Sequence, residues 1–216
     1  MKLMILTTET LHHTFFVREM AKNYNDVMVL CETKKNQRAL YDTSHDFEKI
    51  RNDFEKNLWF NNKKSVLKNF VEVKNVISIN SKASISFLKK TNPDLIIVFG
   101  TGLIKKEIIS SFENKIYNLH GGNPERYRGL DSHLWSIFHR DYKGLITVIH
   151  KVDNRLDTGD IVMKGNVPLY PGMKIHELQS SNTNLCLSLS NQLIKMALNG
   201  NIISQEQSEV GRYYHA

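Results

Sequence analysis

Three polar side chains of this sequence have the types that acyl transfer to an amine requires. Asn118 and His120 lie in the segment Asn-Leu-His-Gly-Gly, and Asp157 follows His120 by thirty-seven positions. An amide and an imidazolium can donate hydrogen bonds to the oxyanion of a tetrahedral intermediate. A carboxylate beside the imidazole can hold the imidazolium and relay a proton from the attacking amine. We therefore predict acyl transfer to an amine, with Asn118, His120 and Asp157 as the catalytic residues.

Both segments follow apolar runs that have the character of strands. Residues 115–117 precede Asn118, and residues 146–152 precede the loop that holds Asp157. In an open α/β sheet, ligands bind outside the carboxyl ends of the parallel strands. We therefore expect the two segments to meet at one edge of such a sheet.

The rest of the chain supplies alternating strands and helices. The pattern predicts strands at 2–7, 26–31, 70–76, 94–99 and 116–119, and helices at 15–23, 83–90, 104–111, 132–139 and 174–198. This alternation is typical of an α/β fold with an open, mostly parallel, twisted sheet flanked by helices, a Rossmann-type arrangement. Residues 44–70 carry apolar side chains at helical spacing, which predicts a long helical insertion.

Length and composition predict one domain over residues 1–205, followed by a polar and loosely held tail at 206–216. No apolar run approaches the roughly 18 residues that cross a bilayer, and the first strand is too short for a signal peptide. These features predict a cytoplasmic protein without membrane insertion. Cys31 and Cys186 lack metal-site spacing, so we expect two reduced core thiols and no metal.

The formal charge of +7 favours anionic ligands, but the lysine pairs are scattered along the sequence. We interpret these lysines as solvent-exposed surface residues and not as one continuous basic patch. We therefore expect small anionic partners and do not expect nucleic acid. The sequence leaves a homo-oligomer open.

The segments PDLIIVFGTGLIKKEII, IYNLHGGNPERYRG and ITVIHKVDNRLDTGDIV, between residues 93 and 167, resemble the folate-dependent formyltransferases. The resemblance implies a formyltransferase-like fold, 10-formyltetrahydrofolate as formyl donor, and catalytic roles for Asn118, His120 and Asp157. It also implies that the pterin lies against the loop after the apolar strand 94–99. The folate-binding residues would be Thr101, Gly102, Leu103 and Ile104, with Asp153, Asn154 and Arg155 closing the other side.

The resemblance also bears on the amine acceptor. Residues 7–13 stand where glycinamide ribonucleotide transformylase has a glycine-rich loop, and the chain stops before the C-terminal domain of methionyl-tRNA formyltransferase. The sequence is more similar to the short N-formyltransferases of surface-polysaccharide pathways, which act on nucleotide-linked amino sugars. We therefore expect such an acceptor, a small anionic amine. Its candidate contacts are Glu9, His12, His13 and Arg128.

Several alternatives stay open. The same catalytic residues would serve a 10-formyltetrahydrofolate hydrolase, a transferase acting on glycinamide ribonucleotide or methionyl-tRNA, or a catalytically silent folate-binding protein. His12 and His13 could be a surface pair at the start of a helix, and His150 could support its loop by a hydrogen bond. Residues 127–129 could form a turn that packs beneath the catalytic loop.

Overall fold

The computed structural model describes residues 1–33 and 46–214. Its main sheet has seven strands in the order β3-β2-β1-β4-β5-β7-β8. The strands are β1 (Leu3–Thr7), β2 (Val27–Glu32), β3 (Glu72–Val76), β4 (Leu95–Phe99), β5 (Ile116–Gly121), β7 (Ile146–Lys151) and β8 (Ile161–Asn166). The first five are parallel, which confirms the predicted fold class.

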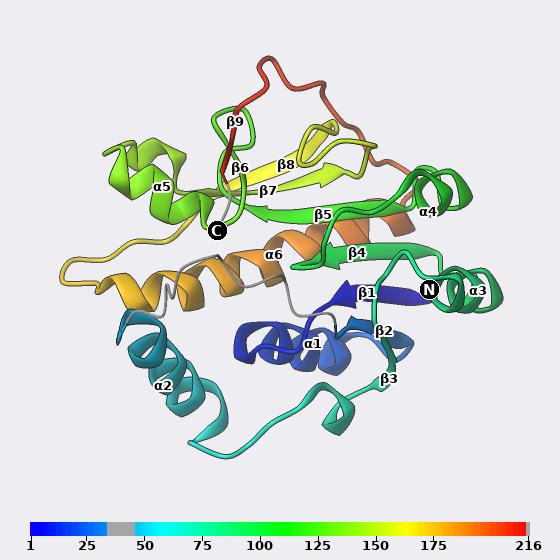
Figure 1. The fold of residues 1–216 in the computed structure, drawn as a ribbon, viewed down its shortest axis with the longest axis horizontal. Helices are drawn as coiled ribbons and strands as arrows, with labels where there is room; N and C mark the ends of the chain where they lie inside the picture. Colours follow the sequence, from blue (N-terminus) through cyan, green and yellow to red (C-terminus); the bar gives the residue numbers. More distant parts are fainter. Residues whose placement is uncertain (34–45, 215–216) are drawn as a thin grey trace.

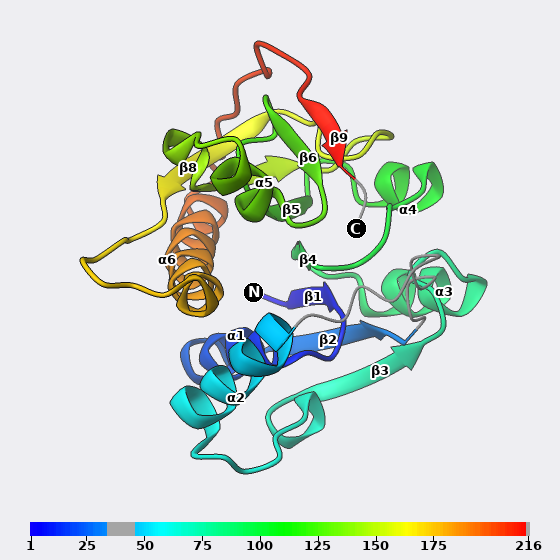
Figure 2. The same ribbon diagram turned by 60° about the vertical axis from the view of Figure 1, so that its left-hand side comes forward.

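Helices cover both faces of this sheet (Figures 1 and 2). Side chains alternate along a strand. Leu3 and Ile5 therefore pack on one core with α1 (Leu11–Asn23) and α6 (Leu178–Leu198), and Met4 and Leu6 pack on the other with α3 (Lys82–Thr91) and α4 (Lys106–Ser111). The strands β1 and β4 are buried along their whole length and lie in the middle. Their carboxyl ends open on the site described below.

The direction of β7 differs from the expectation. β7 is antiparallel to β5, so its last residue, Lys151, lies opposite Tyr117 near the start of β5. We expected the segments of His120 and Asp157 to meet because their strands end at the same edge of the sheet. That reason is wrong. They meet because residues 152–160 fold back along β5 before the chain enters β8.

The expected insertion at 44–70 is helical over part of its length. The helix α2 (Asp46–Phe60) ends where Asn61 and Asn62 take left-handed backbone angles, with φ of 48° and 61°. A left-handed residue cannot continue a right-handed helix. A short 3-10 helix, η1 (Leu67–Asn69), follows. Residues 44 and 45 lie outside the described part of the chain.

The end of the chain also differs from the expectation of a loose tail. The strand β9 (Arg212–Tyr214) pairs in parallel with β6 (Tyr127–Gly129), just before α5 (Ser132–Phe138). Figure 1 shows this segment crossing from the end of α6 to β6. Residues 212–214 are therefore fixed by strand pairing, and residues 215 and 216 lie outside the described residues.

Both cysteines are buried and free, as expected for core thiols. Within residues 1–33 and 46–214, no helix is long and apolar enough to cross a bilayer.

Candidate active site

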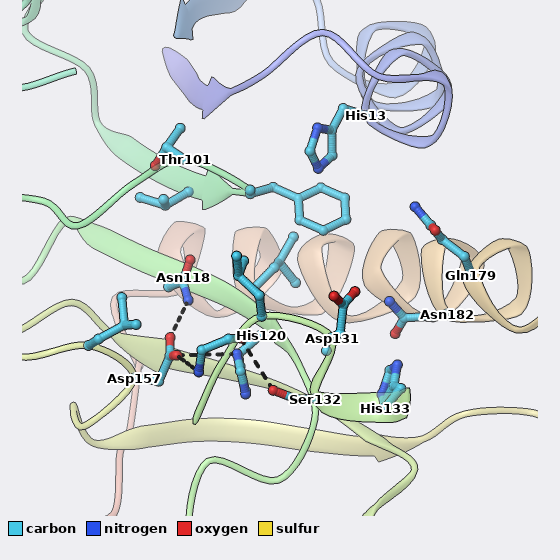
Figure 3. A pocket seen from close by; sticks show the side chains of 18 of the residues that line it. His13, Thr101, Asn118, His120, Asp131, Ser132, His133, Asp157, Gln179 and Asn182 are labelled. Atoms are coloured by element: carbon cyan, nitrogen blue, oxygen red, sulfur yellow. Dashed lines mark hydrogen bonds and ion pairs between the residues drawn. The ribbon is translucent and has the colours of Figure 1, made fainter. Parts of the chain in front are cut away.

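A cavity of about 420 Å³ lies beyond the carboxyl ends of β1 and β4. It is lined by most of the predicted site residues: Asn118, His120, Asp157, Thr101, Gly102, Leu103, Ile104, Asp153, Arg155, His12 and His13. Figure 3 shows Asn118, His120 and Asp157 side by side, with His13, Gln179 and Asn182 facing them across the cavity. Glu9, Asn154 and Arg128 do not line it.

Asn118 is fixed by the antiparallel pairing, which sets it directly opposite His150. Its amide nitrogen lies 3.1 Å from His150 Nε2 and 3.3 Å from Asp157 Oδ1. His150 Nδ1 lies 2.7 Å from the Lys151 carbonyl, which can only accept. Nδ1 is therefore the donor of this contact, and Nε2 faces the Asn118 amide and the Asp157 carboxylate. The supporting role considered for His150 fits these bonds.

His120 is buried next to Asp157. Its Nε2 donates to the Tyr127 carbonyl at 2.9 Å, and its Nδ1 lies 3.6 Å from Asp157 Oδ2. Burial lowers the pKa of His120, and the nearby Asp157 charge offsets this only in part. The resting ring is therefore neutral, with the Nδ1 lone pair toward the carboxylate. A proton that reaches Nδ1 would be held by Asp157.

Asp157 has a left-handed backbone, with φ of 55°, that turns its carboxylate back toward β5. The backbone N–H of Gly129 donates to Oδ2 at 3.0 Å, while Oδ1 accepts from Asn118. Burial alone would raise the pKa of Asp157, but His120, His150 and the Gly129 N–H outweigh it and lower the pKa to about 2. Asp157 is therefore ionised at neutral pH.

One wall of the cavity is the loop at 100–104, the predicted pterin wall. Gly100 has a φ of +79°, and a Cβ there would lie 2.3 Å from the His13 ring, so only glycine lets the loop pass His13. The Gly102 N–H donates to Glu32 Oε2 at 3.0 Å, which fixes the loop from β2. Leu103 is 47% exposed and provides an apolar surface for a ligand.

The loop at 153–156 forms the opposite side. Both oxygens of Asp153 accept from the Thr158 hydroxyl, at 2.8 and 2.7 Å, and one also accepts from the Arg155 N–H. Asp153 therefore holds the shape of its own loop while it lines the cavity. Asn154, also predicted to bind folate, is not among the residues that line the cavity.

Two of the four residues predicted to bind the acceptor are engaged elsewhere. Glu9 Oε1 accepts from the Leu67 N–H at 2.8 Å and so fixes the chain after α2. Arg128 donates through Nε to the Gly211 carbonyl at 2.6 Å and through Nη1 to the Leu156 carbonyl at 3.2 Å. Neither residue lines the cavity, and both side chains have partners in the fold, so their contact with an acceptor stays a prediction. Residues 127–129 form the strand β6 and not the turn that was considered.

His12 and His13 do line the cavity, as neutral rings. Burial lowers the pKa of His13 to about 4, and burial with the His13 charge lowers that of His12 well below its usual value. His13 Nδ1 bonds to Thr8, and His12 Nδ1 contacts the Gln179 amide and the Thr10 hydroxyl. They can offer hydrogen bonds to a ligand but no positive charge at neutral pH.

A second positive charge beside Arg155 comes from Arg51 of α2, which was not among the site residues predicted from the sequence. Arg51 lines the cavity and lies over the ring of Phe47, 5.6 Å from its centre. Its Nε is buried and has no hydrogen-bond partner among the described residues. A side chain four positions after an aromatic residue on a helix meets its ring, and this spacing is the one signal that could have selected Arg51.

The far wall also went unpredicted. Gln179 and Asn182 project from α6, and His133 Nε2 of α5 donates to the Ile146 carbonyl at 2.7 Å. Since a carbonyl only accepts, His133 is the donor. Within residues 1–33 and 46–214, no group of three or more His, Cys, Asp or Glu side chains could hold a metal ion.

A family model described as formyl transferase matches residues 5–185. Methionyl-tRNA formyltransferase of Finegoldia magna is 29% identical over 166 residues, which cover 76% of this chain and 52% of that protein. The chain thus spans about half the length of this relative.

Solved structures share the fold at low identity. Glycinamide ribonucleotide transformylase 1 from Symbiobacterium toebii aligns with a TM-score of 0.65 at 15% identity, over 98% of this chain and 94% of that one. The formyltransferase PseJ from Anoxybacillus kamchatkensis, in complex with UDP-4,6-dideoxy-4-formamido-L-AltNAc and tetrahydrofolate, aligns with a TM-score of 0.58 at 20% identity, over 98% and 85%.

Proposed function

This chain belongs to the formyl transferase family, and from that premise we propose that it transfers the formyl group of 10-formyltetrahydrofolate to the primary amine of a small acceptor. One observation carries the proposal. Asn118, His120 and Asp157 form one connected cluster on the wall of a cavity that is bounded on opposite sides by residues 100–104 and 153–156. A bound folate would thus lie with its formyl group beside an amide, an imidazole and a carboxylate.

The reaction needs a place for the oxyanion and a path for one proton. The amine nitrogen bonds to the formyl carbon, whose oxygen becomes the oxyanion of a tetrahedral intermediate. Asn118 can turn its N–H from Asp157 Oδ1 to that oxygen, because the 3.3 Å bond is the longer of its two. His120, once protonated on Nδ1, stabilises the same charge with Asp157 behind it.

The proton comes from the attacking amine. The ionised Asp157 accepts it directly or through water, and the His120–Asp157 pair passes it to N10 of the folate as the carbon to N10 bond breaks. The amine nitrogen ends with the formyl group, and tetrahydrofolate leaves with the proton. The balance needs no oxidant, reductant or metal.

We further propose a nucleotide-linked amino sugar as the acceptor. Neutral His12, Gln179 and Asn182 suit the hydroxyl groups of a sugar. Arg51, whose Nε has no hydrogen-bond partner among the described residues, suits a diphosphate. A planar guanidinium can make two parallel hydrogen bonds to a phosphate. The sugar nucleotide in the PseJ structure supports the same choice by fold alone.

The test is a panel of acceptors with 10-formyltetrahydrofolate: UDP- and dTDP-linked amino sugars, glycinamide ribonucleotide and methionyl-tRNA. We expect one formyl group to be gained, measured by mass, on a sugar nucleotide and not in the Asp157→Asn variant. Gain on methionyl-tRNA or glycinamide ribonucleotide would overturn the acceptor and keep the transferase. Formate released without any acceptor would indicate a hydrolase. Folate binding without either product would indicate a silent binding protein.

A further inference from the structure

The loop at 152–160, which holds Asp157, is called the catalytic loop below. The end of the chain reaches this loop, although the family model matches only up to residue 185. We call residues 204–214 the C-terminal strap. We propose that the C-terminal strap positions Asp157 for catalysis, with Gln207 as its main positioning residue. This inference rests on the proposed function only for its effect on turnover.

Gln207 contacts the loop on both sides of Thr158. Its Nε2 donates to the carbonyl of Asp157 at 3.0 Å and to the carbonyl of Gly159 at 2.8 Å. Both amide protons are thus used on one turn of backbone. The first of these bonds is made to the main-chain carbonyl of Asp157. It therefore acts directly on the residue whose carboxylate faces His120.

The turn needs such support because Asp157 has a φ of 55°. A left-handed backbone at a residue other than glycine costs of order 1–3 kcal/mol and persists where the surroundings hold it. Gly159 adds a second restriction, since a Cβ there would lie 1.9 Å from the Lys151 carbonyl. The loop therefore has a defined shape that its own sequence does not favour.

A second attachment runs through β6. Arg128 joins the Gly211 carbonyl of the C-terminal strap to the Leu156 carbonyl of the catalytic loop. β9 pairs with β6, and the Gly129 N–H at the end of β6 donates to Asp157 Oδ2. The strand that presents this N–H is thus held in place by the C-terminal strap.

A third attachment closes the other end of the loop. The backbone of Gln205 makes two hydrogen bonds with Ile161, each of 2.8 Å, and the Ser204 hydroxyl donates to Asp160 Oδ2 at 3.0 Å. The C-terminal strap therefore holds the loop before, at and after Asp157. The side chain of Gln205, by contrast, makes no hydrogen bond to the described residues, and it offers a matched control for Gln207.

The experiment compares Gln207→Ala and Gln207→Met with Gln205→Ala. Methionine keeps the length of the side chain and removes both donors. We expect both Gln207 variants to lower kcat by about ten- to a hundredfold, as a misplaced catalytic group does, with KM for both substrates within about twofold. Gln205→Ala should keep the kcat of the unchanged protein.

A second readout does not depend on activity. Hydrogen exchange of the Gly129 amide reports its bond to the Asp157 carboxylate, so we expect faster exchange in both Gln207 variants and no change in Gln205→Ala. If the unchanged protein formylates no acceptor, this exchange still tests the inference while the proposed function fails. Normal Gly129 exchange, normal kcat, an equal effect of Gln205→Ala, or global unfolding of both Gln207 variants would overturn it.

Discussion

Replacing Asp157 with asparagine tests the centre of the mechanism while it keeps the shape of the side chain. The carboxylate receives an N–H from Asn118 on one oxygen and an N–H from Gly129 on the other. An asparagine has one oxygen and one NH2 group, so one of these two donors must face another donor. The variant also removes the charge that would hold a proton on His120.

The stability cost can be worked from the pKa of Asp157. The folded state lowers it from 3.8 to about 2, and a shift of nearly two units corresponds to about 2 kcal/mol of stability. Because the folded pKa is depressed, this stabilisation is present above about pH 4 and is lost as the pH falls toward 2. The unpaired donor adds about 1–3 kcal/mol. We expect Asp157→Asn to lower the free energy of unfolding by about 3–5 kcal/mol at pH 7.

The effect on turnover should be separate from this loss. We expect kcat to fall at least about a hundredfold, or about 2.7 kcal/mol of transition-state stabilisation, with KM for folate little changed. Urea unfolding followed by fluorescence gives the stability, and formyl transfer followed by mass gives kcat, both on soluble folded protein.

Asp160→Asn is the matched control. Asp160 lies three residues further along, is partly exposed, and bonds to Lys151 and Ser204. It should change stability by less than about 1 kcal/mol and kcat by less than about threefold. Near-normal turnover of Asp157→Asn, or a stability difference that stays constant from pH 7 to pH 3, would refute the assigned role of the carboxylate.

Three further changes test other parts of the site. Leu103→Asp should weaken folate binding at least about tenfold by calorimetry, because it sets a charge against an apolar ligand surface, and an equal loss of acceptor binding would contradict the proposed folate wall. Arg51→Gln should raise the KM about tenfold or more for a diphosphate-linked sugar and much less for the free amino sugar. Lys49→Gln on the same helix is the control. An equal increase in KM for both acceptors would remove Arg51 from the acceptor site. Glu55 is buried, and burial raises its pKa to about 7. Glu55→Gln should therefore be more stable than the unchanged protein by up to about 3 kcal/mol at pH 8 and equally stable near pH 4. A stability difference independent of pH would show that Glu55 is not a buried acid.

The predicted residues that the structure brings to the cavity are local in the chain. Asn118 and His120 alternate on one strand, and residues 101–104 follow directly from the end of a buried strand. For such residues, strand periodicity and the rule on carboxyl ends suffice. The tRNA, ribonucleotide and sugar readings share these local features, so the acceptor cannot be chosen from them.

The charged residues assigned to the acceptor show the opposite case. Arg128 and Glu9 look free in the sequence, but each is bonded to a backbone group far along the chain, at Gly211 and Leu67. A charge is available to a ligand only when no group of the fold has taken it, and that depends on contacts over 58 and 83 positions. Arg51 was missed for the same reason, since nothing local shows that its Nε lacks a partner.

Asp157 combines both cases. Its identity is visible in the sequence, but its position is not, because β7 runs antiparallel to β5 and ends beside Tyr117. The chain must turn back to bring the carboxylate to His120, and it does so through a left-handed residue at 157. A turn of that kind is held by its surroundings rather than by its own preference. We therefore expect the Asp157 carboxylate to be the part of the candidate site most sensitive to distant changes, which would act through the contacts of Gln207 and Arg128.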